Sequence, residues 1–241
     1  MQKETGDRVM RLRRIFLALF LMEIGIYLIV SSLNLNNPAL LASFTKSQQA
    51  ITSQDQFAMF LSIFLHNLLV ATIEFIPILG LLFFVISSVE TSIVISLEGS
   101  AYHVSGLAIF ASLSLYPHTW LELPAYAIAS ASGVYLLYLI IKRGDVLRGN
   151  IRKILYMYLF VVLELGIAGA FESTEIVMLG SYPSPDNVLY PLALWIPGIP
   201  ALWMLIILFR RINRNEYVKK TEEEGKEGPD EGDAEATYMQ F

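Results

Sequence analysis

Residues 123–141 read LPAYAIASASGVYLLYLII and contain no charged side chain. About 20 apolar residues in a helix cross the hydrocarbon core of a bilayer. Other charge-poor runs lie at 15–33, 57–76, 78–97, 101–116, 154–172 and 192–209. With 55% hydrophobic and 16% charged residues, the 241-residue chain has the composition of a membrane protein. The sequence therefore predicts an all-α, polytopic transmembrane helical bundle.

Lysine and arginine fall in three clusters, within residues 1–14, within 142–153 and from 210 onward. The positive-inside rule predicts that all three, and both termini, are on the cytoplasmic side of a cytoplasmic membrane. The linker 34–56 then lies outside, so an odd number of crossings joins it to residue 142. Four apolar runs lie between these points, so one of them does not cross. We expect six crossings plus re-entrant or half-helix material near 78–123, where Pro77, Gly80, Gly99, Gly106 and Pro117 interrupt the pattern.

The composition divides the chain into four parts. A basic N-terminus (1–14) precedes the transmembrane domain (15–209). A basic juxtamembrane segment (210–220) is expected to lie along anionic headgroups. Residues 221–241 hold eight acids against one lysine and cannot bury a core, so we expect a disordered cytoplasmic tail.

No lysine or arginine occurs between Lys46 and Lys142, although this stretch contains all three histidines and several acids. An ionisable side chain within a span is costly unless it is paired, hydrated or neutralised. A histidine partner, water or a bound cation would meet that need, and no other cofactor is expected. The candidates for a polar core are His66, Asn67, Glu74, Pro117, His118, Glu122, Pro124, Glu164 and Glu172.

Local spacing gives three further expectations. Thr119 and Glu122 have the spacing of a capping box, which predicts a helix that starts at Trp120 with His118 beside its start. Asn67 and Glu74 share one helical face, with His66 one residue aside. Small residues at helical spacing predict close helix packing at Ala125, Ala129 and Gly133, and at Gly166 and Ala170. A capped, buried half-helix without chemistry is the alternative for the stretch 115–133.

Three stretches resemble the stage II sporulation protein M family of integral membrane proteins: FLHNLLVA (64–71), PHTWLELPA (117–125) and IAGAFEST (167–174). The resemblance covers about residues 55–175, with Thr119 where the family motif has glycine. Bacterial members are implicated in envelope remodelling, as scaffolding partners of peptidoglycan-cutting proteins, so the resemblance implies a scaffold. It implicates Asn67, Pro117, His118, Glu122, Leu123, Pro124, Ala125 and Glu172.

Three functions follow from these observations. The first is a non-enzymatic membrane scaffold or envelope-remodelling component that recruits membrane or cytoplasmic proteins through 142–153 and the tail, and whose small-residue stripes also allow a homo-oligomer. The second is a cation- or proton-coupled transporter or channel that uses intramembrane Glu and His side chains. The third is an intramembrane metal hydrolase, with His66, His118 and Glu122 as weak ligand candidates.

Recognised enzyme signatures are missing from the sequence. The chain has no Walker A, Rossmann, HExxH or GxSxG pattern, and no basic face with aromatics that would indicate nucleic acid. The absence of cysteine excludes disulfides and thiolate chemistry. The sequence therefore favours a protein that is not an enzyme.

Overall fold

The computed structural model describes residues 12–142 and 144–224, and every regular element in these two stretches is a helix. Six described segments are long and apolar enough to cross a membrane, which confirms the predicted all-α bundle. They are α1 (Leu12–Ser31), α3 (Gln56–Glu74), α4 (Leu79–Ala101), α6 (Thr119–Lys142), α7 (Gly144–Ser181), and a last segment that passes from α8 (Asp186–Leu189) through η1 (Tyr190–Leu194) into α9 (Trp195–Glu224).

Two shorter helices do not meet the length and hydropathy of a span. These are α2 (Pro38–Thr52) and α5 (Gly106–Leu113). With 8 residues, α5 is about 12 Å long, far less than the hydrocarbon thickness, so it accounts for the expected half-helix material. The run 78–97 forms the crossing helix α4 instead. Three candidate spans (α3, α4 and α6) therefore join the first linker to the end of α6, the odd number that the charge pattern requires.

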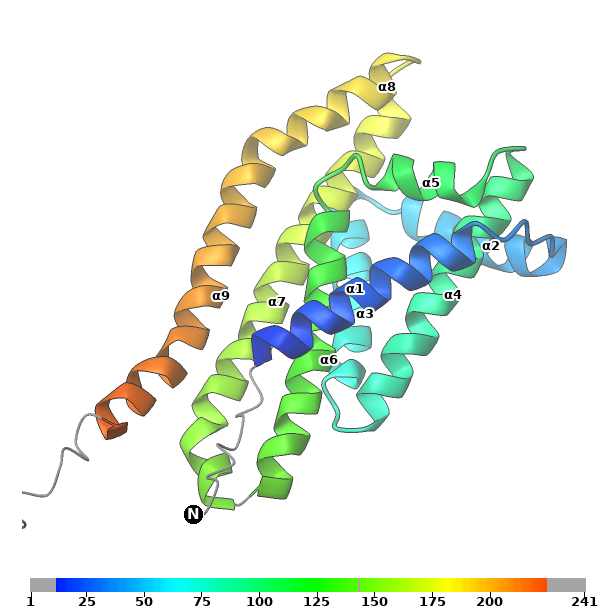
Figure 1. Ribbon diagram of the computed structural model, residues 1–241. Coiled ribbons are helices and arrows are strands. Elements are labelled where there is room, and N and C mark those ends of the chain that lie inside the picture. Colours follow the sequence, from blue (N-terminus) through cyan, green and yellow to red (C-terminus); the bar gives the residue numbers. More distant parts are fainter. Residues whose placement is uncertain (1–11, 143, 225–241) are drawn as a thin grey trace, which may run out of the picture.

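The ends of the helices gather at two sides of the bundle. Figure 1 shows the start of α1, the α6–α7 connection and the end of α9 toward one side, and α5 and α8 toward the other. The structure extends two predicted helices: α7 continues to Ser181, and α9 runs to Glu224, into the first residues of the predicted tail. The remainder of that tail, 225–241, and the first 11 residues lie outside the described part.

Small side chains let α6 occupy the centre of the bundle, where it contacts α1, α3, α4 and α7. Without a hydrophobic driving force inside lipid, helices associate through close van der Waals packing, which small residues allow. A Cβ atom on Gly133 would lie 2.8 Å from the carbonyl oxygen of Phe75, so α6 meets the end of α3 at backbone distance. The alanines of α6 that are fully buried are Ala125, Ala127, Ala129 and Ala131.

A second close approach joins the ends of α1, α4 and α5. A Cβ atom on Gly106 would lie 2.4 Å from the carbonyl oxygen of Ser31 and 2.8 Å from Cα of Ser96. The Ser96 hydroxyl donates to the carbonyl of Leu33 and accepts a hydrogen bond of 3.2 Å from the amide of Leu35. The close approach at Gly106 holds α5 against α1 and α4, just before the chain enters α6.

Candidate functional site

The turn between α5 and α6 is fixed by side chains that donate to three consecutive carbonyl oxygens. The Thr119 hydroxyl donates to Leu113 at 2.8 Å. The indole nitrogens of Trp120 and Trp195 donate to Ser114 at 2.9 Å and to Leu115 at 2.7 Å. Because Trp195 begins α9, the turn is tied to the last crossing as well as to α6.

This geometry differs from the predicted capping box. The structure starts α6 at Thr119, and the carbonyl of His118 accepts from the amide of Glu122 at 2.9 Å. Since the Thr119 hydroxyl donates to the preceding turn, it holds that turn instead of capping α6. Pro117, which precedes His118 in this turn, is buried. A Cβ atom on Gly198 of α9 would lie 2.9 Å from the Pro117 Cβ, so α9 packs closely against the turn.

His118 forms a buried ion pair with Glu175 of α7. Its Nδ1 lies 2.7 Å from Glu175 Oε2, with the two side chains 9% and 5% exposed. Its Nε2 lies 3.2 Å from the Thr119 hydroxyl oxygen. That hydroxyl uses its hydrogen on the Leu113 carbonyl, so it accepts from Nε2. With a donor role at each ring nitrogen, the imidazole is the cation.

The charge on His118 is reflected in its pKa. Burial disfavours the imidazolium, but the hydrogen bond to Glu175 and the nearby Glu122 and Glu172 outweigh it and raise the pKa of His118 to about 9. Burial and Glu175 also raise the pKa of Tyr116, whose ring stacks on His118 with centroids 6.5 Å apart. One cation therefore faces three carboxyl groups at the start of α6.

A pH dependence of stability follows from the raised pKa. The contribution of His118 is complete below the ordinary histidine pKa of 6.5 and is lost as the pH rises through about 9. We expect the free energy of unfolding in detergent to fall across this range and to fall less in His118→Gln. Parallel curves for both proteins would contradict the assignment.

A second polar contact joins α3 to α6 within the span. Asn67 Nδ2 donates to Glu122 Oε1 at 2.6 Å, and Asn67 is 8% exposed. Glu172 of α7 lies against Glu122, close enough for a hydrogen bond between the two carboxyl groups. The structure thus brings together Asn67, His118, Glu122 and Glu172, four of the polar-core candidates, from three helices.

The remaining polar candidates lie elsewhere. Glu74 is 1% exposed and accepts from the Ser87 hydroxyl of α4 at 2.9 Å. Glu164 is buried in α7, and Pro124 lies within α6, partly buried. The side chain of His66 is exposed on α3, away from this group. Within the described residues, no group of three His, Asp or Glu side chains is arranged to hold a metal ion, so the triad His66, His118 and Glu122 is not assembled.

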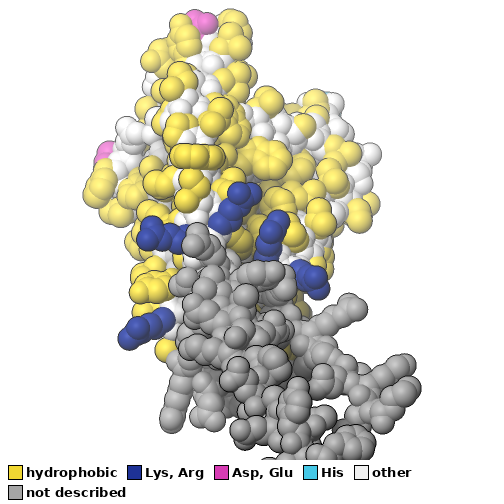
Figure 2. All heavy atoms as spheres, turned by 60° about the vertical axis from the view of Figure 1, so that its left-hand side comes forward, with side chains coloured by type: hydrophobic (Ala, Val, Ile, Leu, Met, Phe, Trp, Pro, Cys, Tyr) yellow, Lys and Arg dark blue, Asp and Glu magenta, His cyan; other side chains and the backbone are white. Residues whose placement is uncertain are grey.

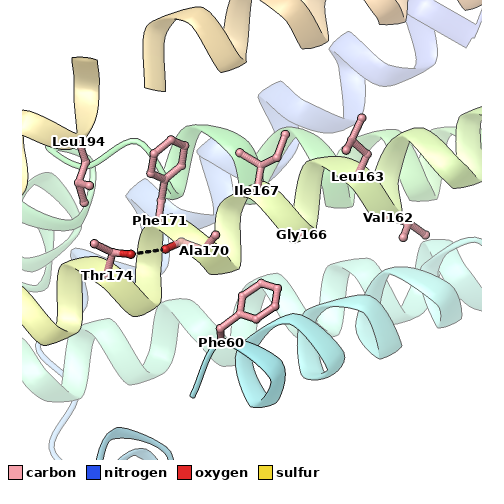
Figure 3. Close-up of a pocket in the computed structure, with 9 residues that line it drawn as sticks. All are labelled: Phe60, Val162, Leu163, Gly166, Ile167, Ala170, Phe171, Thr174 and Leu194. Atoms are coloured by element: carbon pink, nitrogen blue, oxygen red, sulfur yellow. Dashed lines mark hydrogen bonds between the residues drawn. The ribbon is translucent and has the colours of Figure 1, made fainter. Parts of the chain in front are cut away.

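The second small-residue pair lines an open apolar groove. Gly166 and Ala170 of α7 face a groove of about 530 Å³ between α3, α7 and η1 (Figure 3). Its only side-chain hydroxyl is that of Thr174, which donates to the carbonyl of Ala170 at 2.7 Å. The groove contains none of the polar-core candidates. Its lining residues are Phe60, Val162, Leu163, Gly166, Ile167, Ala170, Phe171, Thr174 and Leu194.

Comparison with known proteins decides the family. The model of the family described as Stage II sporulation protein M matches residues 15–174. The chain belongs to the stage II sporulation protein M family. The match confirms the predicted family and extends the common region to α1, while α9 follows after it. No curated protein and no solved structure shows significant similarity to the chain.

Within this member of the stage II sporulation protein M family, the sequence pattern missed the partner of the histidine. The apolar run 154–172 stops three residues before Glu175, whereas α7 continues to Ser181. Glu172 and Glu175 are three residues apart and share a helical face, a spacing that could have identified the second acid. Ser87, the partner of Glu74, carried no such signal.

Proposed function

We propose that the protein is a non-enzymatic membrane scaffold of the cell envelope. The observation that supports it most is that the polar side chains of the family motif bond to one another across helices. Asn67 bonds to Glu122, and His118 to Glu175, so α3, α6 and α7 are joined at two points. Interhelical hydrogen bonds of this kind stabilise a fixed arrangement of helices.

Partner recruitment would then use the segments outside the bundle. The predicted loop 142–153 is not a loop, because α6 runs to Lys142 and α7 begins at Gly144. The basic start of α7 and the acidic residues 221–241 supply charged surfaces for membrane or cytoplasmic proteins, and a homo-oligomer would use the small-residue stripes. The arginines at the start of α1 and at the end of the last candidate span support an orientation with both termini in the cytoplasm of a cell membrane.

Proton- or cation-coupled transport is the second candidate. Glu23, Glu74 and Glu164 each have one buried carboxyl oxygen without a hydrogen-bond partner among the described residues. A buried ionisable group in a span is more often functional than structural. A cation bound at these acids would supply the missing partner.

The substitution Glu122→Gln separates the two functions, because glutamine keeps the oxygen that accepts from Asn67. A scaffold predicts that liposomes containing wild-type protein and those containing the variant show the same proton and sodium flux as protein-free liposomes. It also predicts that cross-linking in native membranes captures the same partners with both, and loses them when 221–241 is removed. Flux above the protein-free level in liposomes containing the wild-type protein would replace the scaffold with a transporter, whether or not it disappears in Glu122→Gln.

A further inference from the structure

Three helices meet at an aromatic contact near one side of the bundle. The Phe209 ring of α9 lies 5.5 Å from the Phe16 ring of α1 and 5.8 Å from the Phe160 ring of α7, measured between centroids. Asn213 of α9 lies beside Met157 of α7, with Nδ2 3.9 Å from the sulfur. These contacts fix the positions of α1, α7 and α9 along their axes relative to one another.

Exposed arginines flank this contact on all three helices: they precede the phenylalanine in the sequence of α1 and α7 and follow it in α9. Arg13 lies three residues before Phe16, about 4.5 Å along the axis, and Arg210 directly follows Phe209. Because α1 and α7 run in one direction and α9 in the other, these residues are displaced from the aromatic contact toward the same side (Figure 1). We call the set the arginine corner: Arg13, Arg14, Arg152, Arg210 and Arg211.

The arginine corner carries charge of one sign beside an apolar surface. Residues 12–22, 150–163 and 201–213 contain no Asp or Glu. Figure 2 shows several dark-blue side chains on this face, with a largely yellow surface next to them. Exposed apolar side chains of the same helices include Leu17 at 44%, Ile206 at 48% and Ile207 at 44%.

We propose that the arginine corner binds the headgroup of an anionic phospholipid. A guanidinium offers a planar fork of donors that matches a phosphate, and basic pockets between transmembrane helices suit such headgroups. The adjoining apolar side chains would receive the acyl chains. The acidic C-terminal segment has the same charge as a phosphate, but its 221–241 stretch, TEEEGKEGPDEGDAEATYMQF, offers little hydrocarbon for that surface. The lipid satisfies both the charge and the apolar side of the site.

Native mass spectrometry of the full chain in detergent tests the proposal, with phosphatidylglycerol and phosphatidylcholine of identical acyl chains as probes. We expect wild-type protein to retain about tenfold more phosphatidylglycerol, and to lose this preference as salt is raised. The triple variant Arg13→Gln, Arg210→Gln, Arg211→Gln should bind both lipids equally. The control Lys219→Gln, Lys220→Gln, Lys226→Gln removes the same charge from the C-terminal segment and should retain the preference. Circular dichroism verifies the fold of each variant.

Three results would overturn the proposal. Equal retention of the two lipids by the wild-type protein would show that the site does not recognise the charge of the headgroup. An equal loss in both triple variants would reflect total charge and not the arginine corner. Binding of phosphatidylglycerol only after removal of 225–241 would identify the acidic segment as the occupant.

Discussion

Substituting His118 with glutamine is expected to lower the free energy of unfolding by about 3 kcal/mol, because it removes one partner of a buried ion pair. Glu175 is 4% exposed and would be left without its cation, next to Glu122 and Glu172. Unfolding by added anionic detergent, followed by circular dichroism, measures the loss. The same variant should also show the weaker pH dependence described above.

The chain provides two matched controls for this substitution. His66 and His103 are exposed, so His66→Gln and His103→Gln should each change stability by less than about 0.5 kcal/mol. The double variant His118→Gln, Glu175→Gln should recover part of the loss, because no charge is then left unpaired. A single His118→Gln variant as stable as the controls would mean that the ion pair does not stabilise the fold.

Gly106→Ala is expected to destabilise the protein by about 3 kcal/mol, the upper range for overpacking. The new Cβ atom would meet backbone atoms, at 2.4 Å from the Ser31 oxygen and 2.8 Å from Ser96 Cα, and backbone cannot turn aside as a flexible side chain does. The loss should appear as a lower midpoint in the same detergent titration.

Gly25→Ala is the matched control, since nothing lies within 4 Å of the Cβ atom it would add. It should be neutral or slightly stabilising, because alanine favours a helix over glycine. If Gly106→Ala and Gly25→Ala had equal midpoints, the close approach of α1, α4 and α5 would not be needed for the fold.

Much of the fold could be predicted because the bilayer imposes a length on each crossing. The charge clusters required an odd number of crossings between 34 and 142, and the structure has three candidate spans there. The sequence did not identify which apolar run is short, since 78–97 and 101–116 are both apolar with interruptions. The glycine contact at Gly106 is a tertiary feature, and hydropathy does not encode it.

The sequence predicted which residues belong to the polar site better than it predicted which of them bond to each other. Helical spacing put Asn67 and Glu74 on one face, yet Asn67 bonds to α6 and Glu74 to α4, because α3 contacts both helices. The contact of His118 with Glu175 depends on how far α7 extends beyond the apolar run. Spacing within one helix does not specify which neighbour a side chain reaches.

The tie between the α5–α6 turn and α9 provides the protein with its own optical probes. Of its three tryptophans, Trp120 and Trp195 donate to carbonyls of that turn, while Trp203 is 67% exposed on α9. Intrinsic fluorescence therefore reports on the surroundings of His118 through the first two indoles. Emission from Trp203 should respond to quenchers carried on lipid chains. The chain has no cysteine for thiol dyes to label, but its own tryptophans allow fluorescence measurements without any label.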